Sequence, residues 1–295
     1  MRFGEIQSME ICFVILHYLA YDMTKECVDM LLDVFSERKI HIAIVDNGSP
    51  NRTGIKLKEQ YADNSSITVL LNKENLGYAR GNNVGYRYIS ERFKPRYIVV
   101  MNNDVLIKDR LFIEKIRDLE DTYGFDVLGP DIHNPYNNIH QNPLRITPIT
   151  VDEVKKRLKE SSFIVKYPHI CYALSILKHS SKGKEPAGRT VEIYGKPRCD
   201  VVLHGACLIF SKHFMEKRKE CFNPKTFIYG EEHILYHECM KQNLKMVYSP
   251  EIYVEHYMRV STDVSFKSNY KKYISRYRRL KESAVVMLNV LEMRG

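Results

Sequence analysis

A run of polar residues follows an apolar stretch in the middle of the chain. Residues 97–101 are rich in β-branched and aromatic side chains, which is typical of a strand buried on both faces. Asn102, Asn103 and Asp104 come next. Their oxygens are ligands that Mg²⁺ and Mn²⁺ accept, with substrate phosphate oxygens filling the remaining positions. The same tripeptide also suits a turn that caps a helix, so other parts of the chain must decide.

A second acidic group lies far along the chain. Gly230 is predicted to open a helix, which puts Glu231 and Glu232 in its first turn. The helix dipole favours carboxylates there, and this alone accounts for both. Beside a metal site, they would also be placed to remove a proton from a substrate. His233 and His237 follow at i, i+4 spacing without the glutamate of the zinc motif His-Glu-x-x-His, so zinc is not expected.

The arrangement of the elements explains how such residues could meet. Strand-like runs alternate with helical patterns, and this cadence predicts βαβ units and a mainly parallel central sheet flanked by helices. Right-handed crossovers bring the carboxyl ends of parallel strands to one edge, so the residues that follow them should share a crevice. The residues expected there are Tyr18, Asp46, Asn75 and Asp104.

Glycines four residues apart mark the helix before the central strand. Gly77, Gly81 and Gly85 match neither Gly-x-Gly-x-x-Gly nor the phosphate loop ending in Gly-Lys-Ser/Thr. On one helix face they would allow close approach of either a ligand or a neighbouring strand. Arg80 and Asn82 lie among them, although packing requires neither, and the forked guanidinium of arginine suits a phosphate.

Composition narrows the class of protein. The 295 residues are 44% hydrophobic and 27% charged, as in ordinary globular proteins. No apolar run is long enough for a transmembrane helix, and residues 1–10 do not have the pattern of a signal peptide. Seven cysteines without a Cys-x-x-Cys pair argue against a disulfide scaffold, so we expect a cytoplasmic protein. The net charge of +9 favours phosphorylated substrates, an anionic membrane or nucleic acid, but no nucleic-acid-reading module is found.

The second half of the chain interrupts this pattern and then resumes it. Residues 133–198 lack clear strands, which indicates an insertion over the crevice rather than an independent domain. After a polar loop at residues 180–189, strand patterns return at residues 200–210, 245–248 and 252–256, and the last of them ends at His256. We expect one α/β domain over residues 1–262 and a basic helical segment over residues 263–295.

Taken in order, these motifs resemble family 2 glycosyltransferases, which are inverting enzymes of the GT-A fold. The subgroup that they most resemble includes rhamnosyltransferase-like enzymes of bacterial surface-polysaccharide synthesis (O-antigen or capsule). The resemblance covers most of residues 11–257 outside the insertion. The segments that carry it are residues 14–18, 44–49, 75–85, 101–105, 205–206, 229–232 and 250–256.

The resemblance implies that a nucleotide-diphospho-sugar of UDP, TDP or GDP type is the donor. Asp46 would accept a hydrogen bond from the base, and Tyr18 would pack against it. Arg80 and Asn82 would lie near the ribose and the phosphates. The residues assigned to donor binding are Tyr18, Asp46, Gly77, Arg80, Asn82, Asn102 and Asn103.

The resemblance also implies a metal site and a general base. Asp104 matches the second acid of the Asp-x-Asp motif, which holds Mg²⁺ or Mn²⁺ on the diphosphate. Asn102 replaces the first acid, so the site carries less negative charge, and His256 matches a histidine that completes the site in several relatives. Glu232 matches the general base. It is one methylene longer than the family's aspartate, so Glu231 stays an alternative.

The basic segment suggests where the acceptor is found. Residues 266–281 interleave Lys and Arg with Tyr270, Tyr273 and Tyr277. Such a helix can lie on an anionic membrane, which suits the family's glycan acceptors, often lipid-linked at the inner face of the cell membrane. A solvated helix is the alternative.

Two other functions remain open at this point. A nucleotidyltransferase that makes a nucleotide sugar would usually carry a Gly-rich basic loop after the first strand, where this chain has residues 17–21. A non-catalytic sugar-binding protein would not need the carboxylates of Asp46, Asp104 and Glu232.

Overall fold

The apolar runs of the sequence form the strands of a single sheet, with the order β3-β2-β1-β4-β9-β6-β10-β5, while β7 pairs with β6 and β8 with β10. The computed structural model describes residues 9–179, 190–257 and 268–292. The strands are β1 (Ile11–His17), β2 (Ile40–Asp46), β3 (Ile67–Leu71), β4 (Tyr97–Asn102), β5 (Val105–Leu106), β6 (Val127–Asn134), β7 (Ile139–His140), β8 (Arg198–Cys199), β9 (Cys207–Ser211) and β10 (Met246–His256).

The sheet is parallel in two parts that an antiparallel strand joins. β1 runs parallel to β2 and β4, and β2 runs parallel to β3. β9 is antiparallel to both β4 and β6, while β6 and β10 are parallel again. The expected mainly parallel sheet is therefore confirmed for the first half of the chain. β9, which lies between β4 and β6, runs antiparallel to both of them.

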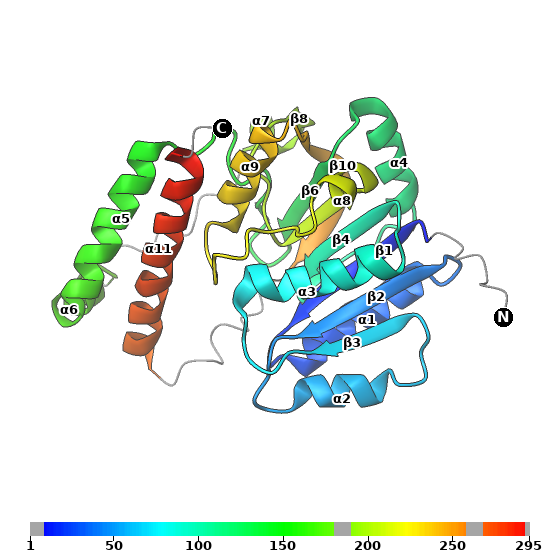
Figure 1. Cartoon of the computed structure of the whole chain (residues 1–295), viewed down its shortest axis with the longest axis horizontal. Helices are drawn as coiled ribbons and strands as arrows, with labels where there is room; N and C mark the ends of the chain where they lie inside the picture. Colours follow the sequence, from blue (N-terminus) through cyan, green and yellow to red (C-terminus); the bar gives the residue numbers. More distant parts are fainter. Residues whose placement is uncertain (1–8, 180–189, 258–267, 293–295) are drawn as a thin grey trace.

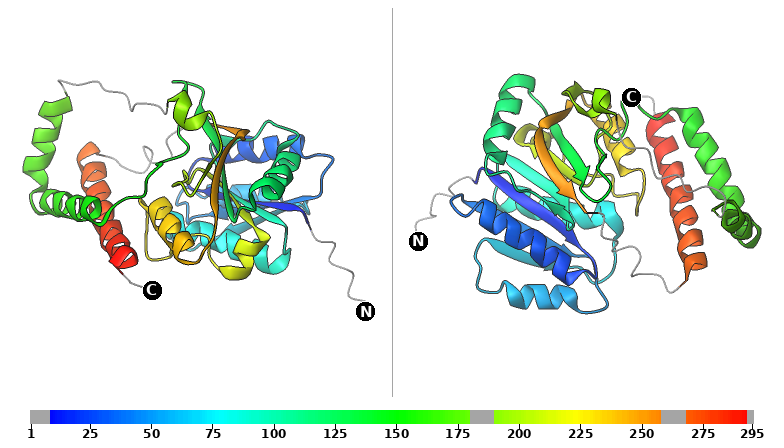
Figure 2. Two further views of the ribbon diagram at one scale, coloured as in Figure 1. Left: turned by 90° about the horizontal axis from the view of Figure 1, so that it is seen from above. Right: turned by 180° about the vertical axis from the view of Figure 1, so that it is seen from behind.

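Helices cover both faces of the sheet (Figures 1 and 2). Side chains alternate along a strand, so Phe13 packs with α1, α2 and α4 on one face, while Val14 packs with α3, α8 and α9 on the other. The helices are α1 (Tyr21–Val34), α2 (Thr53–Gln60), α3 (Gly77–Arg92), α4 (Phe112–Tyr123), α5 (Val151–Lys166), α6 (Pro168–His179), α7 (Val191–Tyr194), α8 (Lys212–Lys217), α9 (Glu231–Lys241) and α11 (Asn269–Glu292).

A group of three helices lies to one side of the sheet (Figure 1). The insertion supplies α5 and α6, and α11 from the basic segment runs alongside α5. Thr150 and Glu153 form a capping box that fixes the start of α5. A small apolar cluster joins the group to α9, which carries the two candidate catalytic glutamates. Its buried members are Ile149, Val154, Ile234, Ala284 and Met287.

Several expected boundaries differ in the structure. The strand expected from Asp200 begins only at Cys207, because Gly205 and Ala206 lie in a turn. The two closing strands form one strand, β10, with a register shift between Ser249 and Tyr253. The polar loop at residues 180–189 and the boundary expected at 262/263 fall outside the described residues.

Candidate active site

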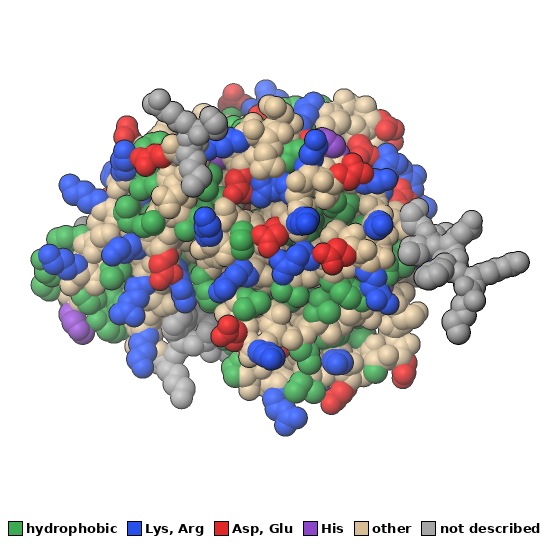
Figure 3. Space-filling model, in the orientation of Figure 1, with side chains coloured by type: hydrophobic (Ala, Val, Ile, Leu, Met, Phe, Trp, Pro, Cys, Tyr) green, Lys and Arg blue, Asp and Glu red, His purple; other side chains and the backbone are tan. Residues whose placement is uncertain are grey.

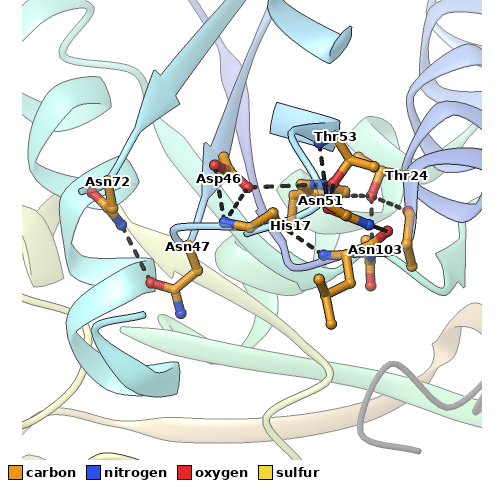
Figure 4. A network of polar contacts seen from close by, with 11 residues as sticks. His17, Thr24, Asp46, Asn47, Asn51, Thr53, Asn72 and Asn103 are labelled. Atoms are coloured by element: carbon orange, nitrogen blue, oxygen red, sulfur yellow. Dashed lines mark hydrogen bonds and ion pairs between the residues drawn. The ribbon is translucent and has the colours of Figure 1, made fainter. Parts of the chain in front are cut away.

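A buried polar network lies at the ends of β1, β2 and β4 (Figure 4). The Thr24 hydroxyl donates to the Ala20 carbonyl, so it accepts from His17 Nδ1 at 2.7 Å and from Asn103 Nδ2 at 2.8 Å. On the other side of the ring, His17 Nε2 lies 2.9 Å from the Thr53 hydroxyl. The network therefore ties the loop after β4 to the loops after β1 and β2.

Asp46 lies beside this network at the end of β2. Its carboxylate accepts from the backbone N–H of Ser49 at 3.3 Å, and the Ser49 hydroxyl accepts from the N–H of Leu19 at 2.9 Å. Burial raises the pKa of Asp46 above its ordinary value and lowers that of His17 to about 4. His17 is thus neutral near pH 7, and its 3.8 Å contact with Asp46 is not an ion pair there.

Asp104 and His256 meet because β5 pairs with β10. Val105 lies opposite His256, so the turn before β5 brings Asp104 Oδ1 to 3.3 Å from His256 Nε2. His256 Nδ1 lies 2.6 Å from Gln141 Oε1, an acceptor, so Nδ1 carries a proton.

This donor pair fits a divalent cation. An imidazole nitrogen and a carboxylate oxygen 3.3 Å apart are both ligands that a divalent cation accepts, and the bond to Gln141 orients the ring as such bonds orient metal ligands. Among the described residues there is no group of three or more His, Cys, Asp or Glu side chains placed for a metal. Substrate phosphate and water oxygens would therefore complete the coordination, as is usual for Mg²⁺.

The start of α3 forms another wall of the crevice. Asn47 bridges the loops: its Nδ2 donates to the Gly77 carbonyl at 3.0 Å, and its Oδ1 accepts from the N–H of Leu76 at 3.0 Å. Gly77 has φ +81°, and a Cβ there would lie 2.3 Å from the Phe227 carbonyl. Arg80 is exposed and donates to the carbonyl of Leu76.

Asn82 is more deeply buried than we would expect of a residue that contacts the donor. It is 1% exposed, and its Nδ2 donates to the Tyr78 carbonyl at 3.1 Å. Its Oδ1 has no hydrogen-bond partner among the described residues. The donor-binding roles assigned to Gly77, Arg80 and Asn82 stay predictions.

The two glutamates occupy different environments at the start of α9. Glu231 is 3% exposed, and burial, followed by the charge of Glu232, raises its pKa. Glu232 is partly exposed and approaches Gly205, where a Cβ would lie 3.1 Å from its Oε1. Burial raises the pKa of Glu232 as well, while a hydrogen bond with the backbone of Gly205 opposes the shift. The hydroxyl of Tyr78 donates to the Gly205 carbonyl at 2.6 Å and holds this turn in place.

A cavity of about 490 Å³ opens in front of these glutamates. Asn102, Gly205, Glu231 and Glu232 line its sheet side, and residues of α5 and α11 form the opposite side. The ring of His204, also in the lining, lies 6.0 Å from that of His256. The cavity thus reaches from the glutamates toward the Asp104–His256 pair.

The structure places the predicted site residues in three groups. Asp46 lies beside His17, to whose network Asn103 also bonds; Asp104 contacts His256; and Glu232 lines the cavity. Their roles stay predictions. His17, Asn47 and Thr24 were missed, although the first two stand directly beside assigned residues at strand ends, which was the available signal. Arg157 of α5 and Arg276 of α11, which line the cavity, are not part of any recognisable sequence motif.

The arrangement of strands and helices described above is the GT-A fold. Mannosyltransferase PcManGT from Pyrobaculum calidifontis, solved with GDP-Man and Mn²⁺, has a TM-score of 0.55 and 10% identity, covering 98% of this chain and 76% of that one. S. aureus TarS 1–349, solved with UDP-GlcNAc, also has a TM-score of 0.55, with 12% identity over 95% of this chain and 66% of that one. At such identities the likeness shows the fold alone.

The sequence identifies the family. The profile described as Glycosyl transferase family 2 matches residues 12–181, more than half of the chain, and the protein belongs to this family. The dTDP-rhamnosyl transferase RfbF of Shigella flexneri is 26% identical over 134 residues, which are 43% of this chain and 43% of that protein. The match spans less than half of that relative's length. The resemblance seen in the motifs is confirmed, which decides against a nucleotidyltransferase.

Proposed function

We propose that the protein is an inverting glycosyltransferase that moves a sugar from a nucleotide-diphospho-sugar to an acceptor hydroxyl. The single observation that carries this proposal is the cavity that Glu232 shares with Asn102, the residue two before Asp104. A base for the acceptor and a site for the donor diphosphate would then face the same space. Bacterial surface-polysaccharide synthesis is the proposed context.

Glu232 acts as the general base in this proposal. It takes the proton of the acceptor hydroxyl while that oxygen bonds to the anomeric carbon, and the bond from this carbon to the diphosphate breaks on the opposite face. Two carboxyls whose charges interact carry one negative charge more easily than two, so Glu231, whose side chain is the less exposed, keeps the proton. A bound Mg²⁺ or Mn²⁺, held by Asp104 and His256, would offset charge on the leaving diphosphate.

In this proposal, residues near the ends of β1 and β2 bind the base of the donor, and residues at the end of β4 bind its diphosphate. Asp46 accepts from the base, Tyr18 packs on it, and Asn102 and Asn103 flank the diphosphate. Because the Shigella flexneri relative is a dTDP-rhamnosyl transferase, a dTDP-linked sugar, and dTDP-rhamnose first, is the donor to test.

A thermal-shift panel of UDP, TDP and GDP, with and without Mn²⁺, tests the donor site. A ligand that binds the folded state raises the melting temperature with occupancy. We expect one nucleotide to stabilise the protein more with Mn²⁺, and Asp104→Ala to abolish the metal-dependent part. If no nucleotide shifts the melting temperature under any condition, the transferase proposal is wrong.

Glu232→Gln tests the base. The amide keeps the shape of the side chain but cannot take a proton, so we expect transfer to fall by at least about a hundredfold while donor-induced stabilisation is retained. Glu231→Gln is the matched control, with a much smaller expected loss. A larger loss in Glu231→Gln than in Glu232→Gln would transfer the role of base to Glu231.

Peripheral contact with an anionic membrane completes the proposal for a cytoplasmic enzyme. Phe163, Ile170, Leu174 and Leu177 recur at helical spacing over α5 and α6, and all are more than half exposed. Figure 3 shows apolar side chains at this end of the molecule, with Lys and Arg nearby. No helix in the described part of the chain is long and apolar enough to cross a bilayer.

We propose a different surface for this contact from the one that the sequence suggested. Tyr270 stacks on His169 of α6 with ring centroids 5.0 Å apart, and both Tyr270 and Tyr273 contact the ring of Tyr172. These tyrosines of α11 therefore pack against a helix rather than facing outward. The exposed apolar stripe on α5 and α6 is the surface that we assign to the membrane.

A further inference from the structure

We propose that Tyr78 is a positioning residue for Glu232: its hydroxyl fixes the turn at Gly205, and the backbone N–H of Gly205 holds the Glu232 carboxylate. The inference rests on the proposed transferase function and adds a residue on which its general base depends. Tyr78 belongs to the first turn of α3, Glu232 belongs to the first turn of α9, and both side chains line the cavity.

Gly205 is the residue at which the two side chains meet. A Cβ on this residue would lie 3.1 Å from Glu232 Oε1 and 3.2 Å from the Tyr78 hydroxyl. The hydroxyl donates to the Gly205 carbonyl at 2.6 Å. The backbone of Gly205 also bonds to the Glu232 carboxylate, and because a carboxylate only accepts hydrogen bonds, the donor is the Gly205 N–H. A single residue therefore connects the phenol with the proposed base.

Neighbouring backbone groups of this turn are engaged as well. The His204 N–H donates to Asn142 Oδ1 at 2.9 Å, and the Ala206 N–H donates to Nδ1 of the His204 ring at 3.1 Å. The Ala206 carbonyl accepts from the N–H of Asn102 at 2.9 Å. These bonds fix the residues on either side of Gly205, and the tyrosine supplies the bond in the middle of the turn.

The Tyr78 side chain is itself held in place. Its ring packs against Phe222 with ring centroids 5.2 Å apart, and its backbone N–H donates to the Phe227 carbonyl at 2.6 Å. Burial, followed by the charges of Glu232 and Glu231, raises the pKa of Tyr78 well above its ordinary value, so the phenol keeps its proton throughout the neutral range. It is therefore a constant donor to the turn and does not titrate itself.

This arrangement favours the base form of Glu232. Burial raises the pKa of Glu232, and the bond from the Gly205 backbone opposes that increase. Without the Tyr78 hydroxyl, the turn would shift and this bond would weaken. The carboxylate would then take up a proton at a higher pH and would be aimed less accurately at the acceptor hydroxyl.

A titration of Glu232 itself tests the inference. Glutamates labelled with ¹³C at Cδ are followed by NMR against pH, and the signal of Glu232 is the one absent from Glu232→Gln. Tyr78→Phe keeps the ring and removes only the hydroxyl, and we expect it to raise the pKa of Glu232 by at least about half a pH unit. The charged and titratable side chains of the cavity lining other than its tyrosines are unchanged in this variant; they are Arg157, Glu160, His204, Glu231, His233 and Arg276.

Hydrolysis of dTDP-rhamnose, with water in place of the acceptor hydroxyl, gives a second readout as release of TDP. In Tyr78→Phe we expect kcat to fall by about tenfold while KM stays unchanged, because the hydroxyl bonds to the turn rather than to a residue assigned to the donor. The NMR titration needs no substrate, so it decides even where hydrolysis is too slow to measure.

Tyr86→Phe is the matched control. Tyr86 lies farther along α3, its hydroxyl also donates to a backbone carbonyl, that of Arg218 at 3.3 Å, and it does not line the cavity. Removing this hydroxyl should leave the pKa of Glu232 and kcat unchanged. Melting temperatures of both variants will show that folding is intact.

Two results would overturn the inference and leave the transferase proposal standing. One is a Glu232 titration that stays in place in Tyr78→Phe. The other is a titration that shifts equally in Tyr78→Phe and Tyr86→Phe, which would mean that both hydroxyls act only through the packing of α3. Failure of every nucleotide to stabilise the protein would instead contradict the transferase proposal, whatever the titration gives.

Discussion

At the scale of single residues, His17 connects the loops of the proposed donor site. Its two ring nitrogens contact Thr24 and Thr53, and Thr24 in turn holds Asn103 in the loop that carries Asp104. A shift of this imidazole would therefore move residues on both sides of the proposed donor site. Because the ring is fully buried and neutral, its protonation is resisted in the folded state.

This predicts a pH-dependent stability difference between the wild type and His17→Gln. The folded pKa of His17, about 4, lies below the ordinary value of 6.5, so the unfolded chain binds the proton first as the pH falls. The wild type should lose about 2 kcal/mol relative to the variant between about pH 7 and about pH 5. Urea unfolding at both pH values measures it, and the other buried histidines cancel in the comparison. A constant difference would contradict a buried, neutral His17.

A second residue-scale prediction concerns the rate profile. Burial raises the pKa of Glu232, so the base form should be lost, as pH falls, at a pH above the ordinary value of 4.5. Because Glu231 keeps its proton while Glu232 titrates, replacing it by neutral Gln should leave this acid limb in place. Measuring kcat/KM against pH for the wild type and Glu231→Gln checks this. An acid limb that moves to lower pH in the variant would mean that Glu231 is charged when Glu232 titrates, which would contradict the assignment of the proton to Glu231.

At the scale of elements, α3 shows why its glycines are spaced four apart. A Cβ on Gly85 would lie 2.4 Å from Val14 of β1 and 2.8 Å from Val45 of β2. A Cβ on Gly81 would lie 2.7 Å from the end of the Leu16 side chain. These two glycines let the helix approach the sheet closely, which was the packing alternative left open from the sequence.

The two positions should respond differently to alanine. Alanine is favoured over glycine in a helix by about 1 kcal/mol, but overpacking costs about 1–3 kcal/mol. Gly85→Ala should destabilise the protein because branched valines on two strands cannot move away easily. Gly81→Ala should cost less because the Leu16 side chain can rotate. Chemical denaturation measures the free energy of unfolding of both variants. An equal loss of stability, or a larger loss in Gly81→Ala, would refute this account of the packing.

Sequence reasoning succeeded for those elements whose signal is local. Apolar runs marked β1, β2 and β4, and Gly230 marked the start of α9, because burial and backbone conformation select those residue types directly. The pairing of α11 with α5 could not be predicted, since it depends on two distant segments meeting. For the same reason, the cavity wall with Arg157 and Arg276 was invisible before the fold was known.

At the scale of the whole molecule, the apolar stripe on α5 and α6 predicts binding to anionic vesicles. Burying Ile170 and Leu174 in a lipid interface should contribute about 1.5–3 kcal/mol each. Ile170→Glu/Leu174→Glu should therefore reduce cosedimentation with phosphatidylglycerol vesicles by at least about tenfold. Leu111→Glu, at a residue 58% exposed before α4, is the control.

Size measurement separates a membrane from a second copy of the chain. If the stripe is a lipid surface, the wild type and Ile170→Glu/Leu174→Glu should have the same mass in solution without vesicles. A wild-type dimer that this double variant dissociates would assign the stripe to self-association and contradict the membrane proposal.

The pairing of α5 with α11 also bears on how the protein is made. A ribosome synthesises α5 well before α11, so the nascent chain can form β1 to β4 and the donor loops while α5 still lacks its partner helix. The wall opposite Glu232 is complete only after α11 has emerged. Each newly made molecule would thus form the loops of the proposed donor site first and complete the cavity in front of Glu232 only after α11 has been synthesised.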